Sequence, residues 1–67
     1  MQNFYNPKSI VTLDITDINT GEIYETIEGI WGGDVKKVIA EISERYNVVK
    51  VERSKYHSNL KTVWVEA

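Results

Sequence analysis

Gly-Ile-Trp-Gly-Gly-Asp, residues 29–34, ends a strand-like alternation and opens the one helical pattern in the chain. Paired glycines interrupt strands, and an aspartate ahead of a periodic apolar stretch is typical of the residue that caps a helix. We therefore expect the chain to pass here from a pair of strands into a helix. The same stretch divides two halves of opposite charge. Residues 1–35 carry one basic and six acidic side chains, a net charge of −5, whereas residues 36–67 carry seven basic and four acidic side chains, a net charge of +3.

Two strands are expected before the glycines. Residues 9–16 alternate between apolar and polar side chains, which is typical of a strand with one buried face. Residues 22–30 continue the alternation less regularly, because Glu25 interrupts the apolar side. Residues 17–21 between them are rich in turn formers and end at Gly21, which can take the left-handed conformation of a bulged hairpin.

A helix is expected over residues 34–46, with the Asp34 carboxylate capping its first turn. Glu41 and Arg45 lie on the helix surface at the i,i+4 spacing that favours an ion pair. Asn47 is a candidate to end the helix in the left-handed backbone conformation. At helical spacing, five side chains fall within an arc of about 100° and form one core-facing stripe: Val35, Val38, Ile39, Ile42 and Tyr46.

Two more strands, residues 48–53 and 60–66, flank a polar loop. The order β-β-α-β-β predicts one small α+β domain over residues 1–67: a largely antiparallel four-stranded sheet with one helix packed across one face. Residues 1–8 are expected to be loosely ordered. The predicted core face of the sheet contains Val11, Leu13, Ile15, Ile23, Ile27, Val49, Val51, Val63 and Val65.

The composition limits how the chain is stabilised. It has 67 residues and no cysteine, which leaves no disulfide and no thiolate metal site to reinforce a small core. Self-association or a partner is therefore favoured over a solitary monomer. The start of the chain has no signal-peptide pattern, and no apolar run approaches the roughly 20 residues of a membrane span. We expect a cytoplasmic protein that does not enter a membrane.

No enzymatic constellation is evident. His57 is the single histidine and has no acidic neighbour to orient it, and Asp14 and Asp17 do not share a strand face. The glycines before Lys36 and Lys37 resemble a phosphate cradle only weakly, because an aspartate occupies the position where the anion would lie. We predict no catalytic residue, no metal, no cofactor and no small-molecule substrate.

Aromatic side chains are the candidates for binding. One helix covers one face of a sheet, so Tyr24, Leu60 and Trp64 are expected on the opposite, open face. Trp31 lies in a glycine-flanked loop with few neighbours to cover it. The predicted partner-binding residues are therefore Tyr24, Trp31 and Trp64. Two alternatives remain. In one, Trp64 belongs to the core because the faces of its strand are flipped. In the other, Trp31 folds back as a lid on the helix end and fills the core beside Gly32 and Gly33.

These observations predict a small non-enzymatic protein–protein interaction module that occupies a surface of a host macromolecule. Residue usage rich in Ile, Lys and Asn is often seen in AT-rich genomes, so we expect a bacterial or phage accessory or inhibitor protein. One alternative is a structural homo-oligomer. Another is a nucleic-acid-binding protein, although a pI of about 5.2 is low for that class. Its basic residues, on the third and fourth strands and the loop between them, would be Lys50, Arg53, Lys55 and Lys61.

Overall fold

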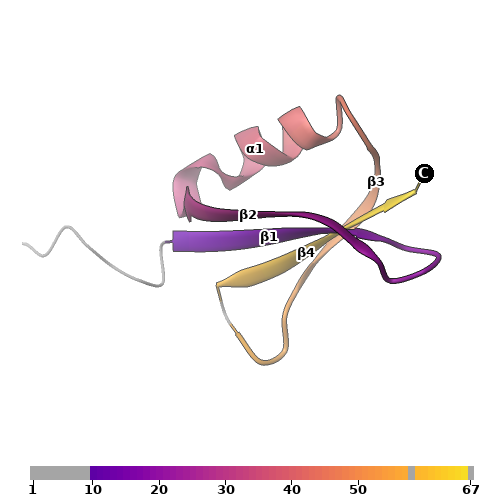
Figure 1. Ribbon diagram of the computed structural model, residues 1–67. Coiled ribbons are helices and arrows are strands. Elements are labelled where there is room, and N and C mark those ends of the chain that lie inside the picture. Colours follow the sequence, from indigo (N-terminus) through magenta and orange to yellow (C-terminus); the bar gives the residue numbers. More distant parts are fainter. Residues whose placement is uncertain (1–9, 58, 67) are drawn as a thin grey trace, which may run out of the picture.

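The computed structural model describes residues 10–57 and 59–66, and the expectation for residues 1–8 lies outside them. The predicted α+β class and the order β-β-α-β-β are confirmed (Figure 1). A short 3-10 turn, η2, precedes the helix. The elements are β1 (Ile10–Asp17), β2 (Ile23–Trp31), η2 (Gly32–Asp34), α1 (Val35–Ile42), β3 (Asn47–Arg53) and β4 (Leu60–Glu66).

The four strands form one sheet in the order β2-β1-β4-β3. Each hairpin is antiparallel, and the two hairpins meet through a parallel pairing of β1 with β4 at the centre. The predicted largely antiparallel sheet is therefore confirmed. Figure 1 shows α1 lying over one face of the twisted sheet, while no described element covers the other face. The sheet thus has a helix side and an open face.

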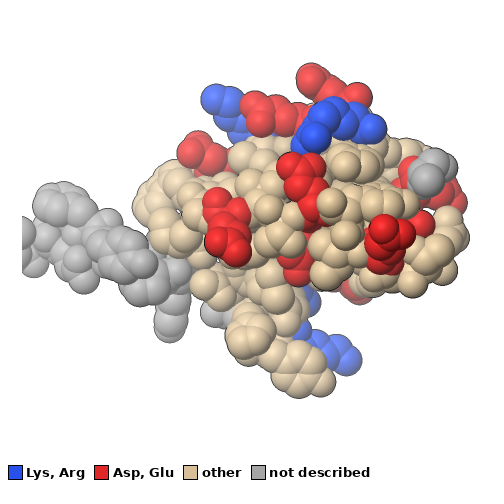
Figure 2. All heavy atoms as spheres, viewed as in Figure 1, with Lys and Arg blue, Asp and Glu red and all other residues tan. Residues whose placement is uncertain are grey.

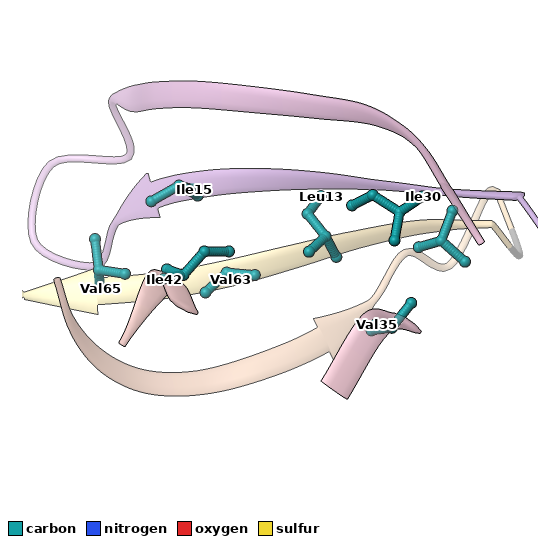
Figure 3. Packing of buried hydrophobic residues seen from close by; sticks show 8 residues of the cluster. Leu13, Ile15, Ile30, Val35, Ile42, Val63 and Val65 are labelled. Atoms are coloured by element: carbon teal, nitrogen blue, oxygen red, sulfur yellow. The ribbon is translucent and has the colours of Figure 1, made fainter. Parts of the chain in front are cut away.

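The core lies between α1 and the two central strands. Leu13, Ile15, Val63 and Val65 are fully buried, as is Ile42 on the helix (Figure 3). The predicted helical stripe is confirmed, because Val35 and Ile42 are buried and its other members pack against the same cluster: Val38, Ile39 and Tyr46.

The ends of the helix differ from the prediction. Asp34 occupies the cap position, but its side chain makes no capping hydrogen bond. The two glycines tighten the chain into the 3-10 turn, so Asp34 has φ −99° and ψ 0° instead of the extended backbone that a capping side chain needs. The α-helix ends at Ile42, not at residue 46, and no described residue other than glycine has a positive φ. The prediction that Asn47 is a left-handed stop is therefore wrong, since Asn47 begins β3.

Bulges in the two outer strands overturn part of the predicted core. Register shifts occur next to Ile23 in β2 and at Val49 in β3. They leave Ile23 53% and Val49 47% exposed, and Val48 packs against the core where Val49 was expected. A one-residue shift moves a side chain to the other face of a strand, which the alternation alone did not reveal.

The turn between β1 and β2 is built as predicted. Gly21 has φ 79°, and its N–H donates to the Asp17 carbonyl at 2.8 Å. The Asp17 carboxylate accepts hydrogen bonds from the Asn19 N–H at 2.9 Å and from the Thr20 hydroxyl at 3.1 Å. An aspartate that binds the backbone two residues ahead fixes a tight turn.

Candidate partner-binding face

The open face of the sheet is the side that α1 does not cover. Residues paired across neighbouring strands share a face, so the register assigns its members in rows. One row is apolar at its centre and contains Ile23, Thr16, Trp64 and Lys50. The next is polar and contains Thr26, Asp14, Thr62 and Glu52, and a third contains Thr12 and Leu60.

Trp64 lies on the open face, as the sequence predicted. Its neighbours Val63 and Val65 are fully buried on the helix side, and successive side chains of a strand point to opposite faces. The alternative that places Trp64 in the core is therefore wrong. Its indole Nε1 donates a 2.7 Å hydrogen bond to Oε1 of Glu52, whose Oε2 lies 3.6 Å from Nζ of Lys50. These contacts hold the ring in one orientation.

Thr16 separates Trp64 from Ile23 in the apolar row. Thr16 is only 5% exposed although no described element covers this face, because its two large register partners flank it. Ile23 itself is largely exposed. Together the three side chains form a small apolar surface at the end of the sheet that carries the β1–β2 turn.

Asp14 places a negative charge in the middle of the open face. Its Oδ1 accepts a 2.8 Å hydrogen bond from the Thr26 hydroxyl. No basic side chain forms an ion pair with Asp14 among the described residues. Asp14 is on a central strand, and its row lies between the apolar row and the row of Thr12 and Leu60.

Tyr24 does not lie on the open face, and that prediction is wrong. The register shift between Ile15 and Thr16 turns its ring to the helix side, where it stacks on Tyr46 with ring centroids 5.9 Å apart and planes 9° apart. Its hydroxyl donates to Oδ2 of Asp17 at 3.0 Å. The neighbouring Arg45 lies over the Tyr46 ring and pairs with Glu25 at 3.3 Å, not with the predicted Glu41.

The hydrogen bonds of this cluster shift two pKa values. Those donated to Asp17, first by the Asn19 N–H and then by Tyr24 and Thr20, lower the pKa of its carboxyl. The bond to Asp17 raises the pKa of the Tyr24 hydroxyl, because the proton is shared with a carboxylate and ionisation would place two negative charges together. Tyr24 therefore anchors the turn.

Trp31 is the more exposed of the two tryptophans, since Trp64 is only partly exposed. Trp31 is 52% exposed, so the alternative in which it fills the core is wrong, although its indole does fold back onto the turn at the start of the helix. Its indole packs on the backbone of Gly33, where an added Cβ would lie 2.8 Å from Nε1. Trp31 pairs with Ile10 and Trp64 pairs with Thr16, six residues along β1. At about 3.3 Å per residue the two rings mark opposite ends of the sheet, roughly 20 Å apart.

The basic residues of β3, β4 and their loop do not share one surface. Lys50 is on the open face and is paired with Glu52, whereas Arg53 and Lys61 are register partners on the helix side. Lys55 lies in the connecting loop. Figure 2 shows acidic side chains spread over the side that β2 presents, with basic side chains at its margins. The predicted basic patch is therefore divided.

Other predicted features are also separated in space. Gly29 lies inside β2 with φ 73°, whereas Gly32 and Gly33 form the 3-10 turn, so the three glycines do not make one cradle. His57 lies exposed in the loop before β4. In the part of the chain that the structure describes there is no detected cavity, no group of three metal-ligating side chains, and no helix long and apolar enough to cross a membrane.

Comparison of the chain with protein family models, with curated protein sequences and with solved structures found no match.

Proposed function

We propose that this protein is a small non-enzymatic binding module that occupies a surface of another protein with the open face of its sheet. The observation that carries the proposal is Trp64, a large aromatic side chain on a face that no described element covers, with its indole fixed by Glu52. Tryptophan is among the residues that contribute most to protein interfaces, and a ring already held in place loses little freedom on binding.

The charges of the open face indicate the partner's chemistry. Ile23 and Trp64 offer apolar contact, and the Asp14 carboxylate beside them has no ion-pair partner among the described residues. A complementary surface would present apolar side chains around a lysine or arginine. Binding of this kind would let the protein act as an accessory or inhibitory subunit.

A pull-down with tagged protein from a host lysate, with and without nuclease, tests the proposal. Trp64→Thr removes the indole but keeps a strand-forming residue, and Tyr56→Ala is a matched control at an aromatic loop residue that is 88% exposed. We expect the wild type and Tyr56→Ala to capture a protein that stays bound after nuclease treatment. Trp64→Thr should not capture it, although circular dichroism shows that this variant is folded.

Two results would count against the open face. Equal capture by the wild type and folded Trp64→Thr would place the binding surface elsewhere. Capture of nucleic acid in place of protein, lost on nuclease treatment or in moderate salt, would favour the nucleic-acid alternative.

A further inference from the structure

The two edge strands of the sheet are protected to different degrees. An edge exposes unpaired N–H and C=O groups that can pair with another chain; bulges and charged side chains discourage such pairing, and like charges placed opposite each other destabilise it. β2 has two register shifts, a glycine with positive φ at Gly29, and the acidic residues Glu25 and Glu28. β3 has a single register shift, at Val49, and then keeps an unbroken register with β4 from Lys50 to Arg53.

We propose that β3 pairs antiparallel with β3 of a second copy about a two-fold axis at Val51, joining two sheets into one of eight strands. The self-complementary sequence Lys50-Val51-Glu52, which follows the bulge at Val49, carries the argument. In this register Lys50 lies opposite the partner subunit's Glu52, and Glu52 lies opposite the partner subunit's Lys50.

The structure already arranges these charges for such a pairing. Lys50 and Glu52 share the open face, since their register partners on β4 are Trp64 and Thr62, and they form a 3.6 Å ion pair within one chain. In the dimer each lysine would have one glutamate on its own strand and one across the axis. The four charges would alternate in sign, which favours the register.

The helix side contributes an apolar contact at the axis. Val51 lies opposite Val63 on β4 yet is 38% exposed, because no strand covers its other flank. Two-fold pairing would place the two Val51 side chains directly opposite each other, and paired β-branched residues stabilise neighbouring strands.

A second copy is favoured over the other ways of covering the edges. Pairing β2 with itself would bring glutamates together across two bulged strands. Pairing β2 with β3 of another copy is a head-to-tail contact, which continues indefinitely unless its rotation closes. The β3 pairing closes at a dimer. The dimer would carry two Trp64 side chains on one continuous open face, and it does not depend on the proposed function.

Sedimentation equilibrium of the full chain, from micromolar to millimolar concentration in low salt, tests the proposal. The wild type should show a monomer–dimer equilibrium. Lys50→Glu and Glu52→Lys should each raise the dissociation constant roughly 10- to 30-fold, because each converts two attractive cross-strand pairs into repulsive ones. Glu28→Lys, on the opposite edge, is the matched control and should leave the dimer intact.

Mixing the two single variants distinguishes pairing across the axis from the ion pair within a chain. Each single variant carries charges of the same sign at positions 50 and 52, so the ion pair within its own chain is lost. A heterodimer of Lys50→Glu with Glu52→Lys nevertheless has two attractive cross-strand pairs. We expect the mixture to dimerise with nearly the wild-type constant, which also shows that both variants are folded. A wild type that stays monomeric at millimolar concentration, an unchanged dimer in either single variant, or a mixture without rescue would overturn the proposal.

Discussion

The two faces of the sheet predict opposite responses at neighbouring residues of β4. Val63→Ala removes the equivalent of two CH₂ groups from a fully buried side chain between α1 and the sheet. The lost transfer free energy is about 1.6 kcal/mol at roughly 0.8 kcal/mol per group, and the remaining cavity raises the cost to about 2–3 kcal/mol. Thr62→Ala alters a partly exposed side chain on the open face and should cost about 1 kcal/mol or less.

Urea unfolding followed by circular dichroism measures both changes. A domain of this size has a free energy of unfolding of about 3–10 kcal/mol, and the lower end of the usual denaturant dependence is about 1 kcal/mol per molar urea. The midpoint should therefore fall by roughly 2–3 M for Val63→Ala and by about 1 M or less for Thr62→Ala. If Thr62→Ala cost as much as Val63→Ala, the assignment of covered and open faces would be refuted.

Three further predictions concern the β1–β2 turn, the bulged strand β2 and the 3-10 turn before the helix. The lowered pKa of Asp17 means that its stabilising effect is complete well above its ordinary pKa of 3.8 and is lost as the pH falls below it. The urea midpoints of the wild type and Asp17→Asn should differ most well above pH 3.8 and should approach each other as the pH falls below 3.8, and a constant difference would contradict this. Gly29→Ala should cost about 1–2 kcal/mol in urea unfolding, because φ is 73° while an added Cβ meets nothing within 4 Å. No loss would show that the backbone there relaxes freely. Gly33→Ala should displace the Trp31 indole and shift its emission in a Trp64→Phe background, with a stability loss below about 1 kcal/mol. Unchanged emission would mean that the indole does not rest on Gly33.

Local patterns predicted the order of elements well. Alternation identified β1 and β4, and helical spacing identified the stripe that packs on the core. Gly21 was predicted from turn chemistry because positive φ is a property of a single residue and its neighbours. The parallel pairing of β1 with β4 was beyond reach, since strands far apart in the sequence meet only through tertiary packing.

The candidate site was predicted only in part, because local patterns reveal alternation within a strand but not bulges or the register between strands. Trp64 was assigned to the open face because its valine neighbours alternate cleanly with it. Tyr24 was misassigned because a bulge turns it toward Tyr46, and no turn residue in the strand reveals that shift. The break of the apolar pattern at Glu25 was the one signal in the sequence that the strand is irregular there. It did not identify the partner of Glu25, because Arg45 lies 20 residues away along the chain. The division of the basic residues between two faces follows from register, which the charge count does not contain.

Nuclear magnetic resonance mapping of ¹⁵N- and ¹³C-methyl-labelled protein with its captured partner tests the proposed binding face most directly. Binding by the open face should shift the Trp64 indole N–H and the methyl groups of Thr12, Thr16 and Thr62. The methyl resonances of Val38 and Ile39 on the helix should keep their chemical shifts. Shifts confined to the helix, with the Trp64 resonance unchanged, would contradict binding through the open face.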